Sequence, residues 1–148
     1  MAPTFTFPEK LALVWFFIDA LTHLTIEAGY VWLALTTTAL KTDSYMGEIW
    51  RQYGRADSRW QVRDANVISL ELITVFLMGP MALYQLYLIW TAKTSKNGSV
   101  FNGLRHVLQI FICTCELYGG WMTFCPEWVD GSPNLDGSDA ILLWVRYL

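Results

Sequence analysis

The stretch FIDALTHLTIE, residues 17–27, lies within an apolar run of residues 11–38, yet it carries three ionisable side chains at intervals of four. The run exceeds the roughly 20 residues that a helix needs to cross the hydrocarbon core of a bilayer. Residues four apart lie on one face of a helix, so Asp19, His23 and Glu27 form a polar stripe. Because ionisable groups are costly at membrane depth, the stripe is expected to face a helical bundle or a wet cavity.

The whole chain has the composition of a membrane protein, since 54% of its 148 residues are hydrophobic and eight are tryptophan. The net charge is -3, and no block of lysine or arginine provides the electrostatic footprint of a nucleic-acid-binding protein. Cys113, Cys115 and Cys125 follow no CxxC spacing and are expected to be buried free thiols. The sequence has no HExxH or paired-histidine motif, so no metal site is expected.

Apolar runs predict four transmembrane helices, of which the last is incomplete: residues 11–38, 67–92, 104–124 and 140–148. Gly79-Pro80 is expected to kink the second helix, because proline lacks an amide hydrogen and clashes with the preceding turn. Cys125-Pro126 is expected to end the third. The predicted fold is therefore an all-α integral membrane bundle that forms one domain over residues 1–148.

The segments between the predicted spans are polar. Residues 41–65 carry charges of both signs, and their apolar residues follow helical spacing: Met46, Ile49, Trp50 and Tyr53. This pattern predicts a short amphipathic helix at about residues 45–54, with its apolar face at the membrane interface. Residues 91–103 and 126–139 are rich in turn-forming residues and are expected to be exposed loops.

The second and third predicted spans also present polar faces. Glu71 and Thr74 lie one turn apart on the second span, and Gln109 and Glu116 share a face of the third, with Tyr118 beside them. Together with the stripe on the first span, these faces can enclose a pocket with four carboxyl groups and one imidazole. Several ionisable residues at membrane depth favour a functional interpretation.

Each of these residues also has a structural interpretation. A single histidine within a membrane span is usually a hydrogen-bonded packing residue, and Thr74, Gln109 and Tyr118 could equally be hydrogen-bond partners between helices. Tryptophan is typical of the belt at the membrane interface. Trp121, near the middle of its helix face, could instead line the pocket and stabilise a cation.

An imidazole among carboxylic acids in an apolar cavity is suited to proton transfer. Desolvation disfavours the charged forms of both groups. A neutral carboxylic acid can protonate an alkene or an epoxide, and aromatic faces can stabilise the carbocation that follows. The natural substrate for such a cavity is a lipid.

Seven segments occur in a specific order and spacing: HLTIEAGYVW, EIWRQYGRADSRW, RDANVISLELIT, GPMALY, LRHVLQ, ELYGGW and EWVDG. They resemble the emopamil-binding protein family, whose shared core is the EXPERA domain. Family members are membrane-embedded helical bundles of the endoplasmic reticulum, among them the sterol 8,7-isomerase and fungal transmembrane terpene cyclases. The resemblance implies that His23 and Glu27 match the family's His-x-x-x-Glu pair, and that Glu71 and Thr74 match its Glu-x-x-Thr. These four positions form the catalytic pocket of the isomerase.

The sequence also departs from the isomerase. Asp19 is an additional acid, Gly120 replaces an aspartate, and the tryptophan of the last isomerase helix would lie just beyond Leu148. We therefore expect an intramembrane acid/base enzyme that protonates an isoprenoid lipid and steers the carbocation without a metal or organic cofactor. Terpenoid cyclisation is favoured over sterol 8,7-isomerisation, because the acids are more numerous and the sterol-specific features are missing. A non-catalytic lipid- or amine-binding protein and a structural membrane subunit are the alternatives from other classes.

The expected catalytic residues are Asp19, His23, Glu27 and Glu71. The expected substrate-binding residues are Thr74, Gln109, Glu116, Tyr118 and Trp121. The expected partners are the endoplasmic reticulum membrane and an isoprenoid or sterol lipid, and a homodimer is left open. The sequence determines neither the substrate, nor the first proton donor, nor the orientation in the membrane.

Overall fold

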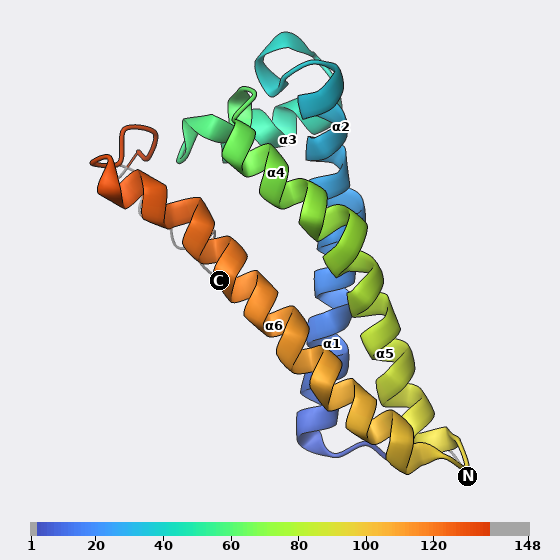
Figure 1. Ribbon diagram of the computed structural model, residues 1–148. Helices are drawn as coiled ribbons and strands as arrows, with labels where there is room; N and C mark the ends of the chain where they lie inside the picture. Colours follow the sequence, from blue (N-terminus) through green and yellow to red (C-terminus); the bar gives the residue numbers. More distant parts are fainter. Residues whose placement is uncertain (1–2, 137–148) are drawn as a thin grey trace. The chain divides into compact units, whose positions relative to one another are not determined.

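Three long helical stretches make up most of the chain in a computed structural model that describes residues 3–136 (Figure 1). Each is long and apolar enough to cross a membrane: Phe7–Thr36, Ala65–Thr94 and Gly98–Val129. The first three predicted spans are therefore confirmed, and the chain is a helical membrane protein. The fourth predicted span, residues 140–148, lies outside the described residues.

The first two stretches each contain an irregular turn between two α-helices. The first comprises α1 (Phe7–Leu21), η1 (Thr22–Glu27) and α2 (Ala28–Thr36). The second comprises α4 (Ala65–Ile73), η4 (Thr74–Met78) and α5 (Gly79–Thr94). The third is the single helix α6 (Gly98–Val129), and the short helices η2 (Ala39–Lys41), α3 (Tyr45–Tyr53) and η3 (Ser58–Gln61) join the first stretch to the second.

The described chain forms two compact units, and the boundary between them falls within all three long stretches. The first unit comprises residues up to Glu27 together with Ile73–Tyr118. The second comprises Ala28–Leu72 together with the chain from Gly119 onward. Each unit has its own hydrophobic core.

In the first unit, α1 packs along α5, and the part of α6 in this unit contributes to the same core (Figure 1). The buried core residues are Phe16, Ala20, Met78, Ala82, Ile89 and Ile112. Near the start of α1, the carboxylate of Glu9 lies 2.9 Å from Lys93 Nζ and 2.8 Å from Arg105 Nη2. Glu9 and Arg105 are buried, so these ion pairs connect all three helices of the unit.

The loop predicted at residues 91–103 is much shorter in the structure. α5 continues through Thr94, and α6 begins at Gly98, where the carbonyl of Asn97 accepts hydrogen bonds from the N–H groups of Val100 and Phe101. Asparagine and glycine occur both in loops and at helix starts, so their clustering cannot distinguish a long loop from a turn followed by a new helix.

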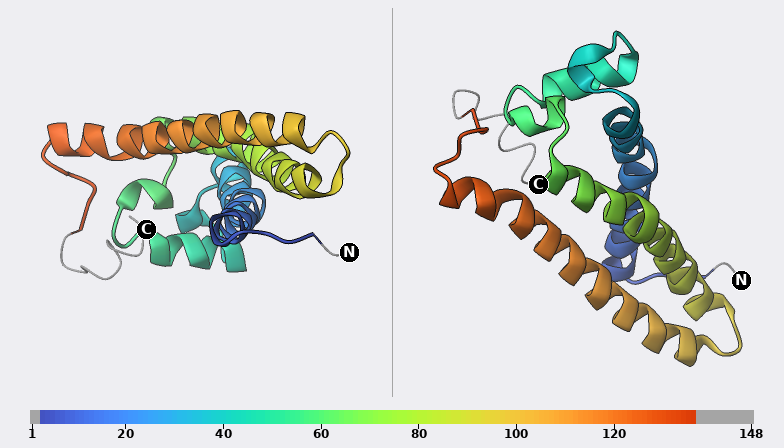
Figure 2. Two further views of the ribbon diagram at one scale, coloured as in Figure 1. Left: turned by 90° about the horizontal axis from the view of Figure 1, so that it is seen from below. Right: turned by 45° about the horizontal axis from the view of Figure 1, so that its top comes forward.

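In the second unit, the core is built from aromatic side chains. Trp50 of α3 stacks on Trp60 of η3 with ring centroids 5.0 Å apart, and Tyr30 of α2 contacts both rings. α3 lies across the end of α2 rather than along it (Figure 2). The predicted amphipathic helix is confirmed, but the contact predicted for its apolar face is wrong. Trp50 is buried in the protein core and Met46 packs against that core, because aromatic partners from neighbouring elements are within reach.

An ion-pair cluster accompanies this aromatic core. Arg59 of η3 contacts both carboxylate oxygens of Asp57, at 3.0 Å and 2.8 Å, and its Nε lies 3.4 Å from Glu127 Oε1. All three side chains are buried. Burial alone would lower the pKa of Arg59, but the hydrogen bonds and charge of Asp57, together with the charge of Glu127, raise it above its ordinary value. The guanidinium therefore stays charged.

The sequence predicted that the third span ends at Cys125-Pro126, and this prediction is wrong. α6 continues through Pro126 to Val129, so Glu127 is a buried helical residue rather than part of an exposed loop. In the turn that follows α6, the carbonyl of Asn134 accepts a hydrogen bond of 3.0 Å from the N–H of Ser58, the first residue of η3. These tertiary bonds hold the helix end in place.

The outer surfaces of the spans are apolar, as expected of helices that face lipid. The strongly exposed side chains include Trp32, Phe76, Val107, Ile110 and Leu117. The thiols differ from their predicted burial: Cys113 is exposed, and Cys115 and Cys125 are half-buried. All three are free, as predicted. A thiol that faces lipid is still shielded from water. The apolar character of cysteine, from which burial was predicted, is therefore compatible with this position too.

Candidate active site

The polar stripe of the first span lies where the helix changes from α to π geometry. Thr22–Glu27 form the π-helical turn η1, with Asp19 in the last turn of α1, His23 inside η1 and Glu27 at its end. π-turns are rare within α-helices and are frequent at functional sites. The predicted stripe is confirmed, because the carboxyl groups of Asp19 and Glu27 both lie beside the imidazole of His23.

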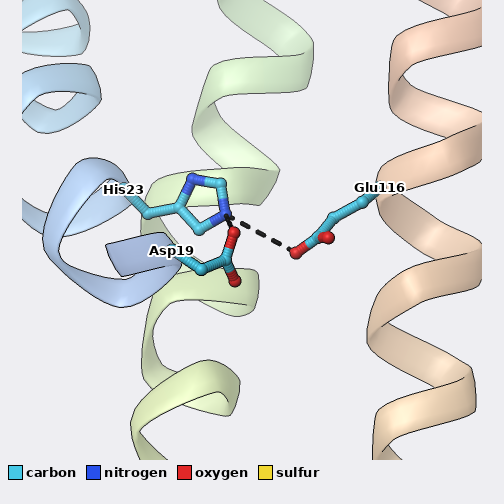
Figure 3. A group of neighbouring side chains, drawn as sticks. All are labelled: Asp19, His23 and Glu116. Carbon is cyan, nitrogen blue, oxygen red and sulfur yellow. Dashed lines mark ion pairs between the residues drawn. The ribbon is translucent and has the colours of Figure 1, made fainter. Parts of the chain in front are cut away.

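Three carboxyl groups surround the His23 imidazole in the first unit. Nδ1 forms a hydrogen bond of 2.5 Å with Glu27 Oε2. On the other side of the ring, Nε2 lies 3.3 Å from Asp19 Oδ1 and 3.8 Å from Glu116 Oε1, which reaches it from α6 (Figure 3). The imidazole is 9% exposed. The structure therefore places Glu116, which the sequence predicted as a substrate-binding residue, beside three of the predicted catalytic residues: Asp19, His23 and Glu27.

Hydrogen bonding within this group is incomplete. His23 Nε2, Asp19 Oδ2 and Glu116 Oε1 are buried and find no hydrogen-bond partner among the described residues. Each buried polar atom that lacks a partner costs about 1–3 kcal/mol. Three such atoms in one place indicate that the group is built to hold something more, such as a transferable proton, an ion or a ligand group.

A second π-helical turn, η4, packs against η1 in the same unit. The N–H of Gly79 donates to the carbonyl of Thr74, five residues earlier, and the π-helical turn ends at Met78, directly before the Gly79-Pro80 pair at which the sequence predicted a kink. A Cβ atom at Gly79 would lie 2.9 Å from Leu24 Cδ2 and 3.2 Å from His23 Cβ. Glycine thus allows the second span to approach the backbone that carries His23.

The other predicted site residues are distributed over both units. Thr74 belongs to the first unit, as does Tyr118, which is exposed. Glu71 of α4 is buried and belongs to the second unit. Trp121 is also in the second unit, where it is exposed and meets the Trp128 ring edge-on at 6.1 Å.

Gln109 lines two neighbouring cavities of the first unit, of about 460 and 590 Å³. Pro8, Ala12 and Cys113 line both cavities as well. Glu116 lines neither of them within the part of the chain that the structure describes. Gln109 therefore lines a hollow between α1 and α6, and the pocket predicted to enclose Gln109 together with Glu116 stays a prediction.

Gln85 is a buried polar residue of the first unit that sequence reasoning missed, as it missed Glu9 and Arg105. Gln85 of α5 is fully buried, and neither polar atom of its side chain has a hydrogen-bond partner within residues 3–136. The sequence does show this glutamine in the middle of an apolar span, where a polar side chain is costly, and that position could have identified it.

Comparison with protein families was consistent with these observations. Residues 45–148 match the model of the EXPERA family, the expanded EBP superfamily. This match covers more than half of the chain.

Individual relatives extend the similarity toward the N-terminus. A probable 3-beta-hydroxysteroid-Delta(8),Delta(7)-isomerase from Arabidopsis thaliana is 32% identical over 123 residues, which are 83% of this chain and 51% of the relative. The corresponding isomerase from Cavia porcellus is 30% identical over 140 residues, 94% of this chain and 56% of the relative. Isomeliandiol synthase MOI2 from Melia azedarach is 28% identical over 142 residues, 95% of this chain and 60% of the relative.

The chain thus spans between about half and three fifths of the length of these relatives. The three apolar helices, the order of the motifs and the family match all agree. The protein therefore belongs to the EXPERA, or expanded EBP, superfamily.

Proposed function

We propose that this chain is an intramembrane acid/base enzyme that protonates an isoprenoid lipid and directs the resulting carbocation. The observation that carries the proposal is the gathering of Asp19, Glu27 and Glu116 around the buried imidazole of His23 in a helical membrane protein. The names of the relatives, which include two 3-beta-hydroxysteroid-Delta(8),Delta(7)-isomerases and an isomeliandiol synthase, support this reaction class.

In this proposal, His23 receives or delivers a proton at Nε2. The short hydrogen bond from Nδ1 to Glu27 holds the ring orientation and leaves Nε2 free to exchange its proton. Asp19 and Glu116 stabilise the imidazolium when the proton is on the ring. Imidazole is suited to this role because one ring nitrogen can exchange a proton while the other keeps its hydrogen bond.

The remaining predicted residues complete the proposed machinery. Glu71, which is buried on α4, is an acid/base candidate together with His23. Thr74, Gln109 and Tyr118 are proposed to orient the lipid, and the aromatic face of Trp121 to stabilise positive charge. These assignments rest on the sequence and on the family resemblance.

The first candidate reaction is terpenoid cyclisation started at an epoxide. The acid protonates the oxirane oxygen, the carbon–oxygen bond breaks, and an alkene of the same molecule closes a ring on the carbocation. A base then removes a proton from carbon to form the final double bond. The additional acid Asp19 beside His23 favours this reaction.

The second candidate is a sterol 8,7 double-bond shift, which the names of the two sterol isomerases favour. Here the acid adds a proton to an alkene carbon, and a base removes a proton from a neighbouring carbon. This reaction differs from the first in the destination of the donated proton.

Turnover in deuterated water followed by work-up in ordinary water separates the two reactions. Epoxide cyclisation places the solvent-derived deuterium on a hydroxyl oxygen, where it washes out, so mass spectrometry should find none retained from initiation. An alkene shift leaves one deuterium bound to carbon, and that result would refute the cyclase proposal. Saturable binding without conversion of any sterol, prenylated or epoxidised substrate would instead favour a non-catalytic lipid- or amine-binding protein.

The proposal places the protein in the endoplasmic reticulum membrane, as the family resemblance implies. Fluorescence microscopy of a tagged chain beside an endoplasmic reticulum marker checks this location. A homodimer stays an open arrangement, which crosslinking in intact membranes would detect.

A further inference from the structure

We propose that Asp19, His23 and Glu116 form a binding site for one divalent transition-metal ion. The sequence carries none of the common metal-binding motifs, so this site arises from the fold rather than from a local pattern. The inference concerns binding alone and does not depend on the proposed reaction.

The ligand atoms have the spacing that a metal ion requires. His23 Nε2 lies 3.3 Å from Asp19 Oδ1 and 3.8 Å from Glu116 Oε1, and one ligand atom from each residue lies within 4.8 Å of the others. Metal–ligand bonds of about 2.1 Å at tetrahedral angles separate two ligand atoms by about 3.4 Å. Glu116 reaches this pair from α6, on the side of the ring that carries Nε2 (Figure 3).

Each of the three residues also has a buried polar atom without a hydrogen-bond partner among the described residues. His23 is 7% exposed, and its Nε2 has no hydrogen-bond partner among the described residues, although Asp19 Oδ1 is near enough for an ion pair. Asp19 Oδ2 and Glu116 Oε1 are also buried without a partner in that part of the chain. A bound cation would bring the imidazole and both carboxylates into coordination.

Glu27 prepares the imidazole for metal binding. Its Oε2 lies 2.5 Å from His23 Nδ1, so a neutral ring carries its proton on Nδ1 and directs the lone pair of Nε2 at Asp19 and Glu116. A carboxylate that accepts a hydrogen bond from the distal nitrogen of a metal-binding histidine is a recurrent feature of metal sites. It fixes the tautomer and raises the basicity of the ligand.

The charge of the cluster also favours a divalent ion. If the three carboxylates are ionised, a protonated imidazole leaves two net negative charges in the apolar interior. A divalent ion with a neutral imidazole leaves one. Net charge at membrane depth is costly, so the ion neutralises the cluster better than a proton does.

The donor set suggests which ions bind. One imidazole nitrogen and two carboxylate oxygens suit Zn²⁺ and other first-row divalent ions, with a further coordination position for water or a ligand oxygen. The ion would occupy the same nitrogen that exchanges protons in the proposed reaction. Ion and proton therefore exclude each other at Nε2, and bound metal is expected to inhibit acid/base turnover.

Co²⁺ titration of the purified, metal-free chain in detergent tests the site. Co²⁺ is used because nitrogen and oxygen ligands give visible bands, whereas thiolates add an intense near-ultraviolet band. We expect saturation at one Co²⁺ per chain without the thiolate band. Asp19→Asn and Glu116→Gln should each weaken binding at least tenfold, and Glu27→Gln, which loses only the supporting hydrogen bond, about 10–100-fold.

Matched controls address the other groups that could bind the ion. Asp43→Asn, Glu48→Gln and His106→Asn alter exposed residues of the same types, and Cys113→Ser removes the thiol one turn before Glu116. All four should keep the affinity of the unaltered chain. Circular dichroism and size-exclusion chromatography establish that each variant is folded, and Co²⁺ should raise the melting temperature of the unaltered chain but not that of His23→Asn.

Several results would overturn the site. The first is that the unaltered chain shows no saturable Co²⁺ binding. The second is that His23→Asn binds Co²⁺ with unchanged affinity. The third is that Cys113→Ser or His106→Asn loses Co²⁺ binding. Each of these results is a measurement of Co²⁺ binding, so the test is valid even if the purified protein has no catalytic activity. An inactive enzyme with a normal Co²⁺ site would count against the proposed function alone.

Discussion

The side-chain amide of Asn66 donates a hydrogen bond of 2.9 Å to the carbonyl oxygen of Met122. In a regular α-helix this carbonyl would accept the N–H of the residue four positions later, which is Pro126 and has none. Thr123, the next residue, has a carbonyl that accepts a hydrogen bond from Arg59 Nη1 at 2.9 Å. Side chains from other elements of the second unit thus satisfy the backbone next to the proline, and α6 continues to Val129.

Replacement of Asn66 by alanine should destabilise the protein by about 1–3 kcal/mol, because the Met122 carbonyl loses its donor. The Pro126→Ala change restores a backbone N–H for the same carbonyl. Asn66→Ala should therefore cost less in the Pro126→Ala background than in the natural chain. Thermal unfolding of the four proteins of this double-mutant cycle, followed by circular dichroism in detergent, measures the coupling. Equal costs in both backgrounds would show that Asn66 does not replace the missing donor.

The buried ion pairs of Arg59 should be much more important for stability than an exposed arginine. Arg59→Met leaves the buried carboxylates of Asp57 and Glu127 without their cation, and breaking a buried pair in this way costs about 3–5 kcal/mol. The matched change Arg55→Met alters an exposed residue of the same segment and should cost less than about 1 kcal/mol. Similar losses of thermal stability in the two variants would contradict the assigned role of Arg59.

Enlarging Gly79 should disturb the site through packing. In Gly79→Ala, the new methyl group would meet Leu24 and the Cβ of His23, so η1 must shift and turnover should fall. Gly103→Ala is the control: it also lies inside a helix of the first unit, but its methyl group meets nothing within 4 Å. Gly103→Ala should be neutral or stabilising by up to about 1 kcal/mol, because alanine favours helix more than glycine does. Equal activity in both variants would mean that the close approach at Gly79 is unimportant.

Substitutions in the acid/base group should lower turnover without lowering the expression level of the protein. Glu71→Gln and His23→Asn each remove a proposed proton carrier, and general acid/base catalysis contributes about 10²–10⁴-fold to rates. Asp19→Asn should cost less, and Asp43→Asn, at an exposed position, should leave turnover unchanged. The measurement is product formation by microsomes that express each variant at matched levels. If both His23→Asn and Glu71→Gln keep near-natural turnover, these residues are not catalytic. If Asp19→Asn and Glu71→Gln lose equal activity, the ranking of Glu71 above Asp19 is wrong.

Much of the membrane architecture and one part of the site could be read from local patterns. Apolar runs longer than a bilayer core predicted the three described spans, and helical spacing predicted α3 as well as the stripe of Asp19, His23 and Glu27. These features depend on hydrophobicity and on helical periodicity, which are properties of neighbouring residues. They are therefore available before any long-range contact is known.

The tertiary structure decided what each face of these helices contacts. Pro126 carried a local signal for a helix end, but side chains about 60 residues away in sequence supply the missing hydrogen bonds. The apolar face of α3 turned inward, because Tyr30 and Trp60 offered an aromatic core. Glu116 joined His23, whereas Gln109 on the same helix lines a hollow between α1 and α6. The sequence alone determined which residues are apolar enough to enter the membrane and which polar groups follow helical spacing, whereas only packing between distant segments could determine which of those groups meet.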